Sequence, residues 1–117
     1  KLCVATASSP ELFVPALKEG GIYGAFEGFL TVDDAGRNKS FPDIFLMAAE
    51  RLGLPPADCV AFEDSLTALR AAKRAGMQTV AVYDKSSEGQ TESLKAEADA
   101  FVYAFSEFFE IDQKRGI

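Results

Sequence analysis

The sequence predicts an α/β domain with a parallel sheet, in the three-layer arrangement of a Rossmann-like fold. Short apolar runs alternate with amphipathic segments through most of its 117 residues. Such alternation implies parallel strands joined by right-handed crossovers, with helices on both faces of the sheet. Several apolar runs end abruptly in small polar or acidic residues, and ligands bind beyond that end of the strands in such sheets.

The composition indicates a single domain spanning residues 1–117. The chain is 48% hydrophobic and 26% charged, and no apolar run approaches the roughly 18 residues that would span a membrane. The net charge of −6, without a Lys/Arg cluster, argues against nucleic-acid binding. Cys3 and Cys59 both lie in apolar runs and suit a reducing cytoplasm. Lys1 leads straight into an apolar run, so we expect the amino end to be a cut rather than a natural start.

The first apolar run, residues 2–5, predicts a strand followed by a polar turn and a helix. Thr6, Ala7, Ser8 and Ser9 form the turn, and Ser9 stands where a residue that caps the helix of residues 12–19 is expected. Hydroxyls and free amides at a helix start can bind an anion, although a plain N-cap explains the same residues.

The middle of the chain predicts a strand at residues 29–32, a turn at residues 33–36 and a helix at residues 44–52. Two adjacent aspartates in the turn can suggest a metal, but in such a turn they more often bond their own backbone. Lys39 lies just ahead of the helix, where its charge suits a phosphate or carboxylate partner. The alternative is an ordinary surface lysine.

Glu63 and Asp64 end the apolar run that starts at Cys59, and Ser65 opens an alanine-rich helix at residues 66–75. Two carboxylates at the end of a strand suit Mg²⁺, which takes oxygen ligands and usually one or two protein carboxylates. The alternative is that Ser65 caps the helix and the acidic residues complement its dipole.

The last third of the chain predicts two further strands, at residues 78–83 and 100–103. A polar loop at residues 84–89 leads into a weak helix at residues 90–96. A short terminal helix is expected at residues 105–110, with Phe105, Phe108 and Phe109 turned to the core.

Three polar groups thus follow elements that can reach one sheet edge: the hydroxyls and amides after the first strand, Lys39, and the Glu63–Asp64 pair. Together they are the parts needed to hold a phosphoryl group and its Mg²⁺. Their joint occurrence favours the functional interpretation over the structural explanation of each one alone.

The order of these motifs resembles the haloacid dehalogenase superfamily, in particular its β-phosphoglucomutase and phosphoglycolate phosphatase branch. The resemblance extends from residue 2 to about residue 109. Its motifs are Val-Ala-Thr-Ala-Ser-Ser at residues 4–9, Lys-Ser-Phe-Pro-Asp-Ile-Phe at residues 39–45, Phe-Glu-Asp-Ser at residues 62–65, and Ala-Ala-Lys-Arg-Ala-Gly-Met at residues 71–77.

The resemblance implies roles for these residues. Thr6 would bind the transferring phosphoryl group with help from the Ala7 amide, and Lys39 would stabilise the phosphoryl oxygens and an aspartyl-phosphate. Asp64 would be the principal Mg²⁺ ligand, and Glu63 would ligate directly or through water. Ser8 and Ser9 would touch the leaving group of the substrate.

The sequence departs from the family pattern in two places. The usual Lys-Pro-x-Pro-Asp has Ser40 and Phe41 after Lys39, which we expect to loosen the turn or to alter the wall of the pocket. In addition, the Asp-x-Asp that supplies the family's nucleophile and general acid/base is absent from these 117 residues, as is the helical cap domain. Phosphoryl transfer through a covalent intermediate needs that nucleophile.

In the family's sheet, the missing first strand lies between the strand that carries Thr6 and the strand that carries Glu63. Its absence leaves two unpaired edges, which invite pairing with another chain. We expect one of three outcomes: completion by a missing amino-terminal segment, direct pairing of residues 2–5 with residues 60–62, or self-association.

The resemblance therefore implies a Mg²⁺-dependent phosphatase or phosphomutase that acts on a small phosphorylated metabolite, with this chain as the phosphate- and metal-binding half of its site. The alternative is a non-catalytic binding or interaction domain derived from the same fold. A receiver-like signalling domain is disfavoured, because no aspartate ends a central strand in the required place.

Overall fold

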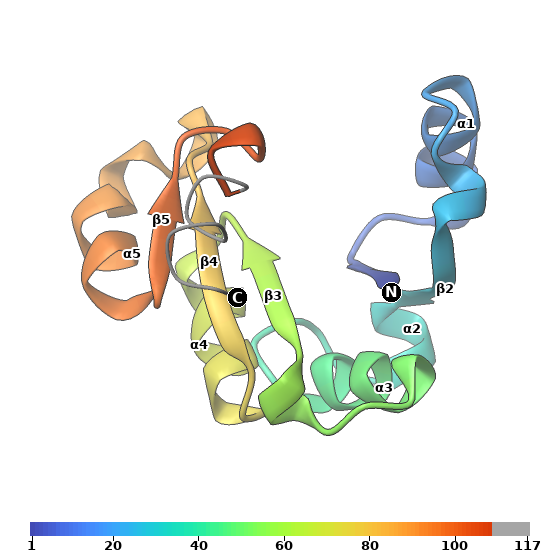
Figure 1. The fold of residues 1–117 in the computed structure, drawn as a ribbon, viewed down its shortest axis with the longest axis horizontal. Coiled ribbons are helices and arrows are strands. Elements are labelled where there is room, and N and C mark those ends of the chain that lie inside the picture. Colours follow the sequence, from blue (N-terminus) through green and yellow to red (C-terminus); the bar gives the residue numbers. More distant parts are fainter. Residues whose placement is uncertain (109–117) are drawn as a thin grey trace.

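The computed structural model describes residues 1–108, which form strands and helices in alternation (Figure 1). The strands are β1 (Leu2–Thr6), β2 (Phe26–Thr31), β3 (Val60–Glu63), β4 (Gln78–Val82) and β5 (Ala100–Val102). The α-helices are α1 (Pro10–Glu19), α2 (Val32–Ala35), α3 (Asp43–Leu52), α4 (Leu66–Arg74) and α5 (Thr91–Glu97). Short 3₁₀ turns are η1 (Tyr23–Ala25), η2 (Pro56–Asp58) and η3 (Lys85–Gln90).

All strand pairs are parallel, which confirms the predicted α/β class. The strands form two sheets, β1–β2 and β3–β4–β5. In the first sheet Ala5 lies opposite Leu30, and in the second Glu63 lies opposite Ala81. Parallel pairing follows from the intervening helices, which return the chain to the same end of the sheet after each strand.

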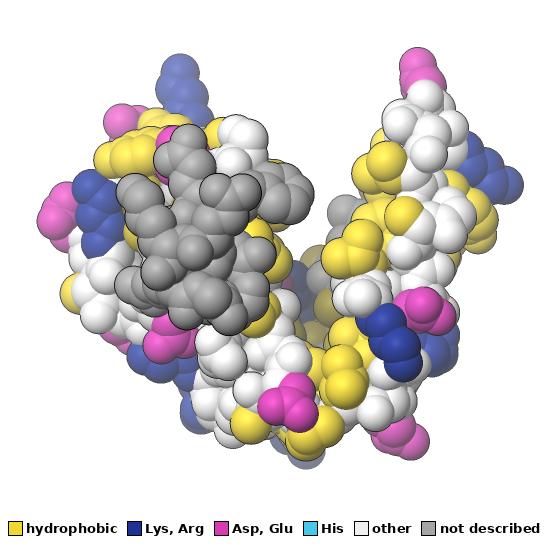
Figure 2. All heavy atoms as spheres, viewed as in Figure 1, with side chains coloured by type: hydrophobic (Ala, Val, Ile, Leu, Met, Phe, Trp, Pro, Cys, Tyr) yellow, Lys and Arg dark blue, Asp and Glu magenta, His cyan; other side chains and the backbone are white. Residues whose placement is uncertain are grey.

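The two sheets stand apart, and within residues 1–108 neither β1 nor β3 has a partner on its other edge. The possibility that residues 2–5 pair directly with residues 60–62 was therefore wrong. Helix α3 packs on β1 and β2, and its buried side chains share one core with those of α4. This shared core sets the spacing of the sheets, and Figure 2 shows a hollow between the two parts of the molecule.

Two hydrophobic clusters hold the fold together. The larger one joins β2, α3, β3 and α4, with Ile44 and Ala72 completely buried. The smaller one packs Leu69 against Ala81 and Leu94, and so joins α4 to β4 and α5. The buried face of α4 consists of leucine and alanine: Leu66, Ala68, Leu69, Ala71 and Ala72. None of the helices described is long and apolar enough to cross a membrane.

The strand expected at residues 29–32 and the turn expected at residues 33–36 both need correction. The strand runs from Phe26 to Thr31, because the edge of β1 pairs with it along that length. Thr31 then starts the short helix α2 through a capping box: its amide donates to Asp34 Oδ2 at 2.8 Å, and its hydroxyl accepts from the Asp34 amide. Asp34 thus bonds local backbone, as expected of an aspartate in such a turn.

Three further expectations differ from the structure. Ser9 occupies the N-cap position of α1, but its side chain makes no capping bond within the described chain. The polar segment expected as a loop before α5 forms the 3₁₀ turn η3. Phe105 is 63% exposed and its ring packs against that of Phe62, whereas Phe108 packs edge-on against the same Phe62 ring. The prediction for Phe109 lies outside the described residues.

The free edges of β1 and β3 predict that these 117 residues, prepared alone, self-associate. Unpaired main-chain donors and acceptors on an apolar edge favour pairing with a second copy. Sedimentation velocity over a range of concentrations is expected to show reversible association, and Val4→Lys, which places a charge on β1, is expected to weaken it. A wild-type chain that stays monomeric at every concentration would show that the free edges of β1 and β3 do not mediate self-association.

Candidate active site

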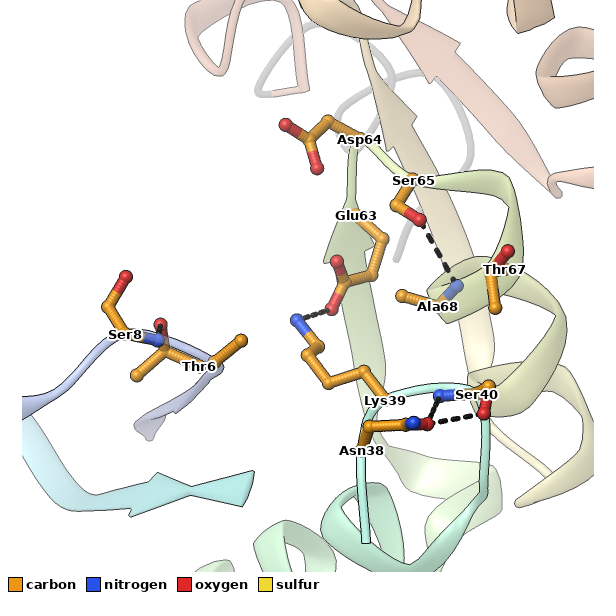
Figure 3. A pocket seen from close by; sticks show the side chains of 11 residues that line it. Thr6, Ser8, Asn38, Lys39, Ser40, Glu63, Asp64, Ser65, Thr67 and Ala68 are labelled. Carbon is orange, nitrogen blue, oxygen red and sulfur yellow. Dashed lines mark hydrogen bonds and ion pairs between the residues drawn. The ribbon is translucent and has the colours of Figure 1, made fainter. Parts of the chain in front are cut away.

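An open pocket lies between the end of β1 and the end of β3 (Figure 3). It brings together six of the seven residues predicted for the site, and leaves Ser9 outside its lining. The lining residues are Thr6, Ala7, Ser8, Asn38, Lys39, Ser40, Glu63, Asp64, Ser65, Thr67 and Ala68. The other five lining residues were not predicted as site residues: Asn38, Ser40, Ser65, Thr67 and Ala68.

Thr6 ends β1 with its hydroxyl already oriented. The Ser8 amide donates to Thr6 Oγ1 at 3.0 Å, which closes a small turn after the strand. Because this bond uses a lone pair of the hydroxyl, the hydroxyl hydrogen remains available for an anion. Thr6 and Ser8 face Lys39 and Glu63 across the pocket in Figure 3.

Lys39 is the cation of the pocket. Its Nζ donates to the Ala5 carbonyl at 3.2 Å and forms a close ion pair with Glu63 Oε1, so it connects the ends of β1 and β3. Its side chain is 20% exposed and its ammonium lies 5.7 Å from the centre of the Phe45 ring. The lysine is therefore held in place and is not a freely solvated surface residue.

Side-chain hydrogen bonds hold the turn that carries Lys39. They act at Ser40, the position of the first proline in the family motif. Asn38 Oδ1 accepts from the Ser40 amide at 2.9 Å and also from the Ser40 hydroxyl. Arg74, at the end of α4, donates to the Ser40 carbonyl. A proline at position 40 would lack the donating amide, so Asn38 substitutes for the rigidity that a proline ring supplies. The expected loosening of this turn is thus compensated.

Glu63 is buried, with 9% of its surface exposed. Burial raises the pKa of its carboxyl group above the ordinary value, while the nearby Lys39 ammonium lowers the pKa and the Asp64 carboxylate raises it. The ion pair therefore offsets only part of the cost of removing the carboxylate from water. Glu63 is engaged by Lys39, so it is poorly placed to serve a metal on its own.

Asp64 is exposed, and its carboxylate makes no hydrogen bond or ion pair with any residue of the described chain. Ser65 directly after it caps α4, accepting from the Ala68 amide at 3.4 Å, so the capping part of the alternative is also true. Mg²⁺ usually takes only one or two carboxylates from a protein, and the free Asp64 carboxylate beside Glu63 at the end of β3 can meet that requirement. Within residues 1–108 there is no cluster of three or more His, Cys, Asp or Glu side chains that could hold a metal alone.

The pocket thus offers a hydroxyl and amides on one side, a fixed ammonium in the middle and a free carboxylate on the other side. These groups suit a phosphoryl group bound together with a divalent cation. The acidic residues that line the pocket with Thr6 are Glu63 and Asp64.

Comparison with known proteins places the chain in a family. Residues 1–76 match the family model of the haloacid dehalogenase-like hydrolases. The chain therefore belongs to this family, and the resemblance seen in its motifs is confirmed.

Individual relatives agree with this assignment. Fructose-1-phosphate phosphatase YqaB of Escherichia coli is 35% identical over 81 residues, which are 69% of this chain and 43% of the relative. The crystal structure of a CbbY variant from Rhodobacter sphaeroides in complex with xylulose-(1,5)bisphosphate is 32% identical with a TM-score of 0.81, covering 92% of this chain and 48% of that one. A haloacid dehalogenase-family phosphatase from Thermococcus onnurineus is 32% identical with a TM-score of 0.77, covering 95% and 49%. The chain spans about half the length of these solved structures.

The raised pKa of Glu63 predicts a specific pH dependence of stability. Between the ordinary value of 4.5 and the raised pKa, the folded protein keeps a proton that the unfolded chain releases, so the free energy of unfolding falls as pH rises through this window. Glu63→Gln removes the titrating group. The stability of this variant relative to wild type is therefore expected to increase across the window.

Urea denaturation from about pH 4 to pH 8 measures this difference. Glu50→Gln, on the exposed face of α3, is the control for loss of one acidic group. Stability curves of wild type and Glu63→Gln that run parallel over the whole range would contradict the assigned pKa direction.

Proposed function

We propose that this chain is the phosphate- and metal-binding half of the active site of a Mg²⁺-dependent phosphoryl-transfer hydrolase, a phosphatase or a phosphomutase. The observation that carries the proposal is the common pocket of Thr6, Lys39 and Asp64, whose hydroxyl, ammonium and free carboxylate match a phosphoryl group and its cation. Membership of the haloacid dehalogenase-like hydrolases supports the same reaction class.

In this proposal, the Thr6 hydroxyl and the amides of Ala7 and Ser8 donate to the phosphoryl oxygens. Lys39 faces them and neutralises the charge that develops during transfer. Such preorganised donors stabilise a transition state more than a ground state when they are aimed at the developing charge. Ser8 and Ser9, which follow in the same turn, would touch the leaving group of the substrate.

Asp64 would hold Mg²⁺, with Glu63 as a second ligand directly or through water. The bound cation would polarise the phosphoryl oxygens and help to orient the attacking group. Because Glu63 is already paired with Lys39, it also fixes the distance between the ammonium and the metal site. One pair of residues would then link phosphate binding to metal binding.

The attacking group itself would come from outside these 117 residues. An aspartate carried by a strand between β1 and β3 would form an aspartyl-phosphate next to Thr6 and Lys39, and the same strand would satisfy both free edges. We also propose a small phosphorylated metabolite as the substrate, since relatives are a fructose-1-phosphate phosphatase and a protein crystallised with xylulose-(1,5)bisphosphate.

The alternative is a non-catalytic binding domain of the same family. It rests on the absence of Asp-x-Asp from these 117 residues. The sequence of the parent protein ahead of Lys1 separates the two proposals: an Asp-x-Asp followed by a helical cap favours the enzyme, whereas a natural start at Lys1 favours the binding domain.

Asp64→Asn in the full-length protein is expected to lower Mg²⁺-dependent hydrolysis of a general phosphate ester by at least about 100-fold, because a neutral amide binds the cation poorly. Asp58→Asn is a matched control: Asp58 is exposed and precedes β3, at the opposite end of the strand. Activity retained by Asp64→Asn, or lost equally in Asp58→Asn, would remove Asp64 from the site.

A further inference from the structure

The turn η3, which follows β4, contacts the end of β3. The Ser87 hydroxyl donates to the backbone carbonyl of Asp64 at 2.7 Å, across 23 residues of sequence. The same hydroxyl lies 3.4 Å from the Asp84 carbonyl, a much weaker arrangement. The stronger of the two contacts therefore joins η3 to the residue that the proposed function assigns to the metal.

The Asp64 carbonyl has no place in regular secondary structure. The β3–β4 ladder ends at the pair Glu63 and Ala81, and the first carbonyl that accepts a bond within α4 is that of Ser65, from the Leu69 amide at 2.9 Å. Asp64 thus links a strand to a helix, and neither of these elements bonds its carbonyl. The Ser87 hydroxyl supplies the hydrogen bond to this carbonyl.

Two hydroxyls therefore hold the backbone that directly follows the Asp64 side chain. Ser65 Oγ accepts from the Ala68 amide, and Ser87 Oγ donates to the Asp64 carbonyl. The Asp64 carboxylate meanwhile has no partner among residues 1–108 and is directed away from α4 in Figure 3. A fixed backbone under a free carboxylate is the arrangement of a preorganised ligand, which loses little conformational entropy on binding.

We propose that Ser87 is a positioning residue for Asp64, and that its hydroxyl sets the affinity of the pocket for Mg²⁺. This inference rests on the proposed function, because it assumes that Asp64 holds the cation. Ser87 itself does not line the pocket, so it acts through the Asp64 backbone. Groups that orient a metal ligand typically change metal affinity by about 10- to 100-fold when removed.

The neighbouring Ser86 provides a matched control. Its amide and hydroxyl both donate to the Asp84 carboxylate, so it stabilises η3 from within, and in residues 1–108 it forms no hydrogen bond with β3 or α4. Ser86→Ala removes the same hydroxyl one residue away. Ser87→Thr keeps a hydroxyl at the proposed position.

The experiment is calorimetric titration of the full-length protein with Mg²⁺ alone, so that no turnover is involved. Ser87→Ala is expected to weaken Mg²⁺ binding about 10-fold, Ser87→Thr to restore most of it, and Ser86→Ala to leave it near wild type. Asp64→Asn is titrated beside them and is expected to abolish binding.

Two results would overturn the inference while leaving the proposed function in place, provided that Asp64→Asn loses binding. One is Ser87→Ala with wild-type affinity for Mg²⁺. The other is Ser86→Ala with as large a loss as Ser87→Ala, which would indicate a general effect of η3. Wild-type Mg²⁺ binding by Asp64→Asn would overturn both the inference and the metal site itself.

Discussion

The ion pair between Lys39 and Glu63 is the interaction on which the candidate site depends. Two parallel sheets stand apart, and Lys39 spans their ends by bonding the Ala5 carbonyl of β1 and the Glu63 carboxylate of β3. At about 4 Å and an effective dielectric constant near 20, such charges attract by roughly 4 kcal/mol. Burial nevertheless raises the pKa of Glu63, against the lowering effect of the Lys39 ammonium. Burying an ion pair carries a large desolvation penalty, so the pair contributes little to folding stability. Its main effect is to hold the Lys39 ammonium in position.

The Lys39–Glu63 ion pair lies at one end of the open space between β1 and β3. The helices α3 and α4 share one core, which keeps the sheets at their spacing although no strand of residues 1–108 joins them. The hydroxyl and amides at the end of β1 and the acidic pair at the end of β3 consequently face each other across that space. If a strand carrying an aspartate occupies it, as proposed, the strand would pair with the free edges of β1 and β3 and would meet the Lys39 ammonium at its end.

Much of this could be predicted from the sequence, because strand ends and helix starts carry local signals. The alternation of apolar runs predicted the parallel α/β class, and the Thr6, Lys39 and Glu63–Asp64 motifs predicted the shared pocket. Contacts between distant segments left no such signal. Nothing around Ser87 indicates that it reaches Asp64, and Arg74 gives no sign that it holds the Ser40 carbonyl. The turn at Asn38 could have been recognised, because an asparagine side chain often accepts a hydrogen bond from the backbone amide two residues later. The length of β2 depended on its pairing with β1.

The most direct test of the central claim is phosphate binding by the full-length protein, measured by calorimetry with and without Mg²⁺, in wild type and in Lys39→Met. If the pocket is the phosphate- and metal-binding half of an active site, wild type will bind inorganic phosphate more tightly with Mg²⁺, and Lys39→Met will lose most of this binding. Lys85→Met, in the exposed turn η3, controls for the loss of one positive charge. Phosphate binding that is unchanged in Lys39→Met, or indifferent to Mg²⁺, would contradict the account.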